Sequence, residues 1–308
     1  MQSSGLIYRH PRSKRHKLCS AVLSRLQSQF SASLVESTFA GELRRRAITD
    51  LAEFRGVVFT AGGDGTLHEV VNGWADLGFP PGIRFAPLPL GTGNDLLYSL
   101  DSRYLDLSNF LHLPLSRKLQ LDLGRISYQT PEGTDSRFFF VGATCGLSGV
   151  VTERRAKLAR VLPGQLSYLV SLAVSFFGWR NCALKLVTGD HMFASNTMIN
   201  FNAANVKFYG GGMVSAPKAD PFCGGLDTVS VNLNLLEALR ALPENFRGDF
   251  DRIPKVEQRR LFEPFRVECS PATVVQADGE ILGKTPMEIE VIPAKLPILL
   301  PDLPLKGW

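Results

Sequence analysis

Residues 61–73 have the sequence AGGDGTLHEVVNG and directly follow the apolar run VVF at 57–59, which is typical of a buried strand. Glycines between a strand and a helix leave backbone N–H groups free, and the N-terminus of the helix favours an anion there. A T-x-x-E capping box at Thr66 and Glu69 predicts that the helix begins at Leu67, with a stop or turn at Asn72-Gly73. This stretch therefore predicts an α/β fold with a phosphate-binding corner.

Asp64 is the unexpected residue of this corner, because its negative charge repels a bare phosphate. A cation between the two would remove the conflict, since Mg²⁺ bridges phosphate oxygens and takes carboxylate ligands directly or through water. The corner lacks the third glycine of a dinucleotide-binding fingerprint and the lysine of a Walker loop. We interpret Asp64 as a sign of a metal–nucleotide complex, with an ordinary Asp-Gly turn as the alternative.

The first part of the chain, up to about residue 125, alternates strand-like and helical stretches, which predicts a parallel sheet with helices on both faces. The predicted strands are 6–8, 34–38, 57–60 and 83–90, and the predicted helices are 18–30 and 41–54. The later part consists of short β-prone runs separated by turns and interrupted by one helical block at about 150–179. We therefore expect a second domain dominated by antiparallel sheet, and 308 residues suffice for two domains.

A second corner, PLPLGTGNDLL, repeats the order of strand, small residues and carboxylate, with Asp95 as the acid. A third carboxylate, Asp122, lies in LQLDLGRI at the predicted end of the first domain. Ligands of open α/β sheets gather where strands end and helices begin. Asp64, Asp95 and Asp122 could therefore converge on a metal-bound triphosphate.

The composition is that of a globular protein, with 44% hydrophobic and 20% charged residues and a net charge of +5. This charge suits nucleotides, nucleic acid or anionic lipid, but no nucleic-acid-binding motif accompanies it. The five cysteines are dispersed without a CxxC pair, which favours a reducing cytoplasm over a zinc site or a disulfide framework. We expect no signal peptide.

Three motifs in chain order, GGDGTLHEVVNG from Gly62, PLGTGND from Pro89 and ADGE from Ala277, carry a resemblance to a known family. The chain resembles the diacylglycerol kinase catalytic-domain family, which includes bacterial soluble lipid kinases, sphingosine kinases and ceramide kinases. ESTFAGELRRRA, NVKFYGGGM and GKTPMEIEVIP are similar to further segments of that family, so the resemblance covers nearly the whole chain.

The resemblance implies a fold of two domains. The first is a Rossmann-like nucleotide-binding catalytic domain of the phosphofructokinase and NAD kinase type, at 1–123, with 293–308 returning to it. The second is an antiparallel, β-sandwich-like, lipid-binding domain at 124–292. ATP and the lipid would be held in a cleft between them.

The resemblance also implies roles for single residues. Asp64, Asp95 and Asp122 would form a network of carboxylates, water and Mg²⁺. Glu280 would be the general base that takes the proton of the lipid hydroxyl, and Asp64 is the alternative catalytic base. The residues that would contact ATP are Thr38, Gly62, Gly63, Gly65, Thr66, Gly91, Thr92 and Asn94.

Two segments depart from the family pattern. The first loop has the sequence His10-Pro11-Arg12-Ser13-Lys14 in place of N-P-x-[SG]-G, and its arginine and lysine could meet phosphate instead. The loop that holds a structural Mg²⁺ in the family corresponds to PKADPFCGGLD at 217–227, where Cys223 replaces the acid. Because a thiol is a poor Mg²⁺ ligand, we expect no intact structural metal site, although Asp220 could compensate.

Residues 153–179 combine basic residues with an apolar stretch at 166–179 that is too short to span a bilayer. The apolar stretch is either a buried core helix or an interfacial helix, and the whole segment is the candidate for lipid access. We expect a cytoplasmic, peripherally membrane-associated kinase that uses ATP and Mg²⁺ to phosphorylate a lipid hydroxyl, with diacylglycerol as the leading acceptor and phosphatidic acid as its product. The alternatives are a sphingoid base or another lipid alcohol, a soluble substrate as in NAD kinases, and a non-enzymatic nucleotide-binding regulator. We expect no nucleic-acid partner, and a homodimer stays open.

Overall fold

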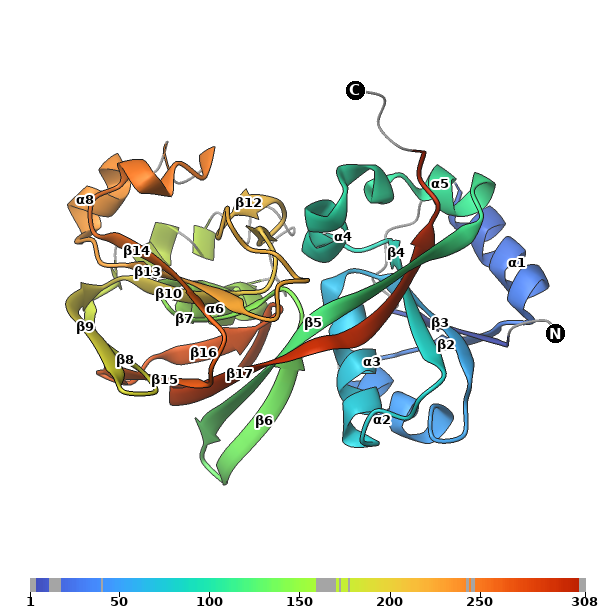
Figure 1. Cartoon of the computed structure of the whole chain (residues 1–308), viewed down its shortest axis with the longest axis horizontal. Coiled ribbons are helices and arrows are strands. Elements are labelled where there is room, and N and C mark those ends of the chain that lie inside the picture. The colour runs from blue at the N-terminus through green and yellow to red at the C-terminus, as the bar shows by residue number, and fades with distance from the viewer. Residues whose placement is uncertain are drawn as a thin grey trace. The chain divides into compact units, whose positions relative to one another are not determined.

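The structure is a computed structural model that describes residues 4–10, 18–39, 41–158, 170–171, 173–176, 178–241, 244 and 247–304. The chain divides into two compact units. The N-terminal unit comprises the residues up to Leu121, Gly210–Gly212 and the segment from Ala294 onward, and the C-terminal unit comprises Asp122–Tyr209 and Met213–Pro293. Two long strands, β5 (Leu115–Thr130) and β17 (Glu280–Pro301), contribute residues to both units (Figure 1).

The N-terminal unit is built on a parallel sheet with the strand order β2-β1-β3-β4-β17. Its other strands are β1 (Gly5–Arg9), β2 (Ser33–Glu36), β3 (Gly56–Gly62) and β4 (Ile83–Pro89). Apolar side chains of β1 and β3, such as Ile7, Val58 and Phe59, are fully buried, as expected for strands that are covered on both faces. This is the α/β arrangement that the alternating strand and helix patterns predict.

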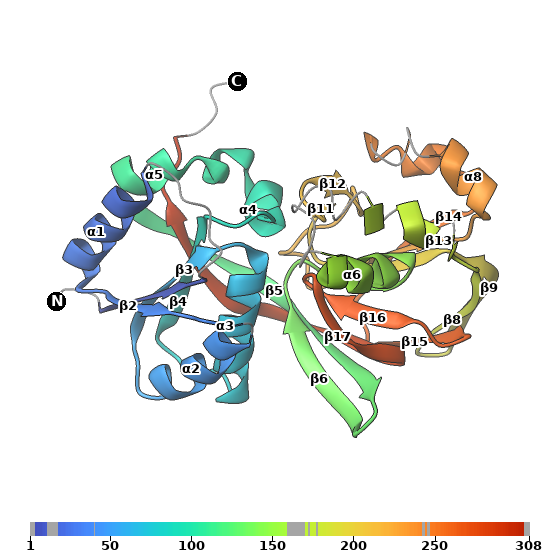
Figure 2. The same ribbon diagram turned by 180° about the vertical axis from the view of Figure 1, so that it is seen from behind.

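Helices cover both faces of this sheet (Figures 1 and 2). They are α1 (Cys19–Phe30), α2 (Glu42–Asp50), α3 (Asp64–Asp76), α4 (Asp95–Leu100), the 3₁₀ turn η1 (Ser102–Leu105) and α5 (Leu107–His112). The chain moves from β1 outward to β2 and then back past β1 to β3, so right-handed crossovers put α1 and α2 on opposite faces. Helix α3 packs against α2, and α5 packs against α1.

Helix α3 begins at Asp64 and not at Leu67, so its N-cap residue is Gly63, which has no side chain to cap the helix. The predicted capping box is wrong because Glu69 has other partners. Its carboxylate oxygens accept hydrogen bonds from the backbone N–H groups of Gly41 and Leu43, each at 3.0 Å. Glu69 therefore satisfies the first N–H groups of the neighbouring helix α2.

The predicted stop at Asn72-Gly73 is also wrong, since α3 continues to Asp76. A Cβ atom on Gly73 would lie 2.5 Å from the backbone oxygen of Arg44 in α2. Glycine is therefore required where the two helices cross closely, and not to end the helix. The Asn72 side chain bonds back within α3, to the backbone oxygen of His68 at 2.9 Å.

The C-terminal unit is a β-sandwich-like domain of antiparallel strands. One row has the order β14-β13-β10-β7-β16, a second has the order β9-β8-β15, and β17 pairs with both β16 and β15. The strands are β6 (Gly133–Phe139), β7 (Gly142–Gly146), β8 (Cys182–Thr188), β9 (His191–Met198), β10 (Asn200–Ala204), β11 (Phe208–Tyr209), β12 (Met213–Val214), β13 (Leu226–Val231), β14 (Val256–Leu261), β15 (Phe265–Ser270) and β16 (Val274–Ala277). Phe139, Phe201, Phe265 and Met287 belong to one buried core between the rows.

The helices of this unit are α6 (Leu147–Leu158), α8 (Leu235–Arg240) and the 3₁₀ turn η2 (Phe250–Arg252). Helix α6 packs against β7 and β16 and forms the first part of the predicted helical block. Most of the predicted lipid-access stretch beyond residue 158 lies outside the described residues. Among the described residues, no helix is both long and apolar enough to cross a membrane.

Candidate active site

The two glycine corners, residues 62–66 after β3 and residues 91–95 after β4, lie against each other. The backbone N–H of Asp64 donates a hydrogen bond to the carbonyl oxygen of Gly93 at 3.1 Å. A Cβ atom on Gly91 would lie 2.1 Å from the Cα atom of Gly63, and one on Gly63 would lie 2.3 Å from the Gly93 oxygen. Because β3 and β4 are parallel neighbours, both corners emerge at the same edge of the sheet.

We expect Gly91→Ala to destabilise the N-terminal unit by about 1–3 kcal/mol, because the added methyl group meets backbone that cannot move aside. Gly93→Ala is the matched control, since a Cβ atom there would make only an ordinary 3.5 Å contact with Asp64. Urea unfolding of both variants checks the prediction. Equal stability of the two would show that the corners are not closely packed.

Asp64 belongs to the first corner, and its carboxylate accepts hydrogen bonds from the start of helix α4 after the second corner. The backbone N–H of Asp95 donates to Oδ2 at 2.7 Å, and that of Leu96 donates to Oδ1 at 3.4 Å. These are the first N–H groups of α4, so Asp64 caps this helix from a different segment of the chain. No motif in the sequence indicates this role, because it depends on the contact between the corners.

Asp95 is 5% exposed and binds the glycine loop Gly210–Gly212 of the same unit. Its carboxylate oxygens accept hydrogen bonds from the N–H of Gly211 at 3.0 Å and from that of Gly212 at 2.8 Å. All three glycines of the loop have φ between 72° and 96°, which L-amino acids with a side chain rarely adopt. The Gly-Gly-Gly segment of NVKFYGGGM thus encloses one of the predicted metal ligands.

The remaining predicted contacts of the nucleotide lie at the same two corners. Thr66 is buried, and its hydroxyl lies over Gly62, where a Cβ atom would be only 2.0 Å away. Asn94 donates a side-chain hydrogen bond to the backbone oxygen of Gly91 at 3.1 Å, whereas Thr92 is exposed. Asn94 therefore stiffens the second corner, and Thr92 is accessible.

Thr38 follows β2, which is separated from β3 by β1 in the sheet. Its backbone N–H and its hydroxyl both donate to Oε2 of Glu42, at 2.6 and 2.8 Å. These two hydrogen bonds hold the pKa of the Glu42 carboxyl below its usual value. Residues 11–17, which include the arginine and lysine of the first loop, lie outside the described residues.

Asp122 does not lie at a strand–helix corner, as its place in the sequence suggested, but within β5. It belongs to the C-terminal unit and is 2% exposed. Its Oδ2 accepts a hydrogen bond from the N–H of Gly224 at 2.6 Å, and its own N–H donates to the oxygen of Pro221 at 2.8 Å. Asp122 thus binds the loop at 217–227.

Glu280 is the exposed first residue of β17 and directly follows the turn between β16 and β17. Asp278 and Gly279 form this turn with φ of 49° and 89°, the geometry of a tight hairpin. The Asp278 carboxylate is buried and accepts hydrogen bonds from three backbone N–H groups, those of residues 140–142, at 2.9–3.2 Å. Asp278 therefore fixes the turn, and Glu280 stays accessible.

The buried polar side chains of Gln276 and Thr144 also hold this turn. The N–H of Gly279 donates to the Gln276 side-chain oxygen at 3.0 Å, and the Gln276 amide group donates to the Thr144 hydroxyl on the facing strand β7. The Thr144 hydroxyl lies 2.6 Å from that of Ser148 at the start of α6. No motif in the sequence indicates this network, because it joins two segments, 144–148 and 276–279, that are distant in the chain.

The described residues contain no group of three or more His, Cys, Asp or Glu side chains that is placed to hold a metal by itself. Mg²⁺ in a nucleotide complex needs only one or two carboxylates, with phosphate oxygens and water as its other ligands. Asp64 and Asp95 provide such oxygens within the N-terminal unit, so the residues present fit a Mg²⁺ that arrives with the nucleotide.

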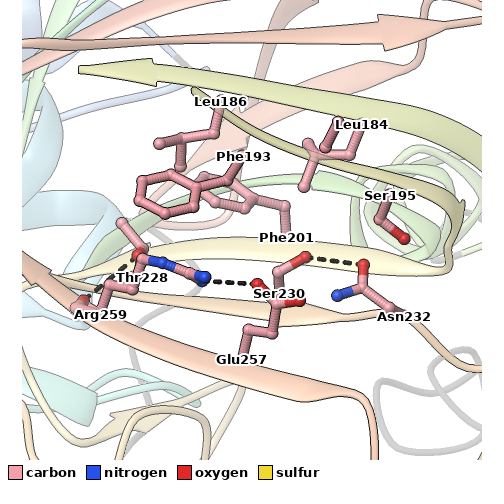
Figure 3. Close-up of a pocket in the computed structure, with 11 residues that line it drawn as sticks. Leu184, Leu186, Phe193, Ser195, Phe201, Thr228, Ser230, Asn232, Glu257 and Arg259 are labelled. Atoms are coloured by element: carbon pink, nitrogen blue, oxygen red, sulfur yellow. Dashed lines mark hydrogen bonds and ion pairs between the residues drawn. The ribbon is translucent and has the colours of Figure 1, made fainter. Parts of the chain in front are cut away.

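A small pocket lies inside the C-terminal unit, between β8–β9 and β10–β13–β14 (Figure 3). Leu184, Leu186 and Phe193 line one side of it, and the Arg259 guanidinium lies over the Phe193 ring at 4.0 Å while it pairs with Glu257 at 2.6 Å. Its volume of about 10 Å³ has room for roughly one water molecule. The pocket is therefore too small for an acyl chain.

Each of the two units contains a segment that matches a known protein family. The diacylglycerol kinase catalytic domain matches residues 8–126, and the YegS C-terminal NAD kinase beta sandwich-like domain matches residues 143–300. A diacylglycerol kinase of Mycobacterium tuberculosis (strain H37Rv) is 29% identical over 266 residues, which are 85% of this chain and 82% of that protein.

Solved structures show the same fold. A diacylglycerol kinase of Bacillus anthracis (strain Sterne) has a TM-score of 0.66 at 15% identity, with 96% of each chain covered. Yeast NADH kinase complexed with NADH has a TM-score of 0.56 at 10% identity, with 100% of this chain and 86% of that chain covered. The resemblance inferred from GGDGT, GTGND and DGE is confirmed, and the chain belongs to the diacylglycerol kinase catalytic-domain family of lipid kinases.

Proposed function

We propose that this lipid kinase transfers the γ-phosphoryl group of ATP to the hydroxyl group of diacylglycerol and so produces phosphatidic acid. The observation that carries the proposal is the contact between the two glycine corners at one sheet edge, with the carboxylates of Asp64 and Asp95 beside them. The diacylglycerol kinase of M. tuberculosis, which this chain resembles over most of its length, supports diacylglycerol as the acceptor.

The N-terminal unit would bind the nucleotide. The first corner begins the 13-residue helix α3, whose dipole favours phosphate at this end. Asp64 and Asp95 would hold the Mg²⁺ of the nucleotide directly or through water. When bound, that ion neutralises charge on the phosphoryl oxygens.

The C-terminal unit would supply the general base. The Glu280 carboxylate takes the proton of the lipid hydroxyl as the hydroxyl oxygen forms its bond to the γ-phosphorus. The bond from the γ-phosphorus to the bridging oxygen breaks, and ADP leaves with that electron pair. Asp278 and Gln276 hold the turn before Glu280, so the base acts from a fixed backbone.

The acceptor would be reached at a membrane surface in the cytoplasm. The net charge of +5 favours an anionic lipid surface, and lipid substrates of this kind reside in bilayers. Peripheral attachment is the arrangement that we propose.

Incubation of the protein with labelled ATP, Mg²⁺ and a panel of diacylglycerol, a sphingoid base and NAD, followed by chromatography, tests this function. We expect label in phosphatidic acid, the product of phosphoryl transfer to diacylglycerol. The transfer should be fast enough to detect, because a positioned carboxylate accelerates transfer to an alcohol by about 10²–10⁴-fold. Label in the sphingoid base alone would reassign the acceptor. Label in NAD alone, or ATP binding without any transfer, would contradict the proposal.

A further inference from the structure

We propose that the guanidinium of Arg260 takes the place of a structural Mg²⁺ in the loop at 217–227, so that this loop folds without a divalent metal. The proposal concerns the stability of the C-terminal unit and does not depend on the reaction proposed above. The evidence for the proposal is the set of hydrogen bonds and ion pairs that the polar atoms of this loop form within the protein.

The side chains that could bind a metal in this loop are either unsuited or otherwise engaged. Cys223, at the position of the family acid, directs its thiol to the carbonyl oxygen of Gly225 at 3.4 Å. Asp220, the residue that could compensate, accepts a hydrogen bond from the N–H of Phe222 at 3.0 Å and is exposed. The described residues around the loop form no group of three metal-binding side chains.

Arg260 joins the two ends of the loop. It lies directly opposite Asp227 in the register of β13 and β14, and its Nε and Nη2 atoms lie 3.0 and 2.9 Å from Asp227 Oδ2. The same Nη2 also donates to the backbone oxygen of Lys218. A carboxylate and a backbone carbonyl are the oxygen ligands that a hard cation would bridge, and here one guanidinium bridges them.

The ion pair between Asp227 and Arg260 is partly shielded from solvent, so we expect its loss to lower the stability of the C-terminal unit. The Asp227 side chain is 12% exposed and that of Arg260 is 34% exposed. The middle of the loop is held by Asp122, through Gly224 and Pro221 as described above. The loop is therefore fixed at its start, middle and end by groups of the protein.

The first test needs no variant. The thermal unfolding midpoint of the full, nucleotide-free chain is measured in excess EDTA and in Mg²⁺ at equal ionic strength. A ligand that binds only the folded state raises the midpoint, so we expect no difference between the two conditions. A midpoint that rises with Mg²⁺ would overturn the proposal.

The second test removes the guanidinium. We expect Arg260→Met to lower the midpoint by roughly 4–8 °C, because it leaves Asp227 sheltered without its cation. Arg266→Met is the matched control, since Arg266 forms exposed pairs with Glu268 and Glu288, and we expect a shift below about 2 °C. Equal shifts for the two variants would contradict the proposal.

The third test restores an acidic residue at position 223, where the family has one. In the double variant Cys223→Asp with Arg260→Met, a carboxylate stands at the position of the family acid, close to that of Asp227, and the guanidinium is absent. We expect its unfolding midpoint to rise with Mg²⁺ and to fall with EDTA, in contrast to the natural chain. A midpoint that ignores Mg²⁺ would show that Arg260 does not occupy the place of a metal ion.

Discussion

Glu280→Gln is expected to lower kcat for lipid phosphorylation by about 10²–10⁴-fold and to leave the Kd for ATP nearly unchanged. Glutamine keeps the size and the hydrogen-bonding oxygen of glutamate, but it does not accept the proton of the lipid hydroxyl. Glu280 is exposed, and the turn before it is held by Asp278 and Gln276, so the fold does not depend on its charge. Steady-state kinetics with ATP and lipid, and calorimetric titration with ATP, measure the two quantities.

Glu288→Gln is the control for this variant. Glu288 is an exposed glutamate of the same strand β17 and pairs with Arg266 at 2.7 Å. Its replacement removes the same charge from the same strand, and we expect activity close to that of the natural chain. A Glu280→Gln enzyme that is as active as the Glu288→Gln enzyme would remove Glu280 from the mechanism and leave Asp64 as the base.

The sequence predicts the fold well because the relevant signals are local. Strand-like runs alternate with helical spacing up to about residue 125, and short β-prone runs follow. Such patterns depend on which face of each element is buried, and right-handed connections then leave few topologies. The two glycine corners were also predictable, since strands that are parallel neighbours end at one edge of the sheet.

The polar contacts were not predictable in the same way, because each partner comes from a distant segment. Glu69 matches a capping box, yet it caps the neighbouring helix α2, and Gly73 matches a helix stop, yet it allows the close crossing of two helices. Asp122 lies within strand β5 and not at a corner, and the sequence pattern does not reveal this strand. In each case a tertiary contact outweighs a local preference.

Asp64→Asn and Asp64→Ala are expected to differ in stability while both lose activity. Asparagine keeps an oxygen for the N–H groups of Asp95 and Leu96, so Asp64→Asn should cost a few tenths of a kcal/mol and Asp64→Ala about 1 kcal/mol. Both variants lose the negative charge that we propose to hold Mg²⁺ on the nucleotide. We therefore expect each to lower kcat/KM by about 10²-fold or more.

Asp106 provides the matched control, because it caps the six-residue helix α5 by accepting a hydrogen bond from the N–H of Ser108 at 2.9 Å. Asp106→Asn and Asp106→Ala should reproduce the two stability changes without loss of activity, as measured by urea unfolding and by kinetics over a range of Mg²⁺ concentrations. A fully active Asp64→Asn enzyme would mean that Asp64 serves only to cap α4. The aspartate of GGDGT would then belong to an ordinary Asp-Gly turn, and the Mg²⁺ of the nucleotide would need another ligand.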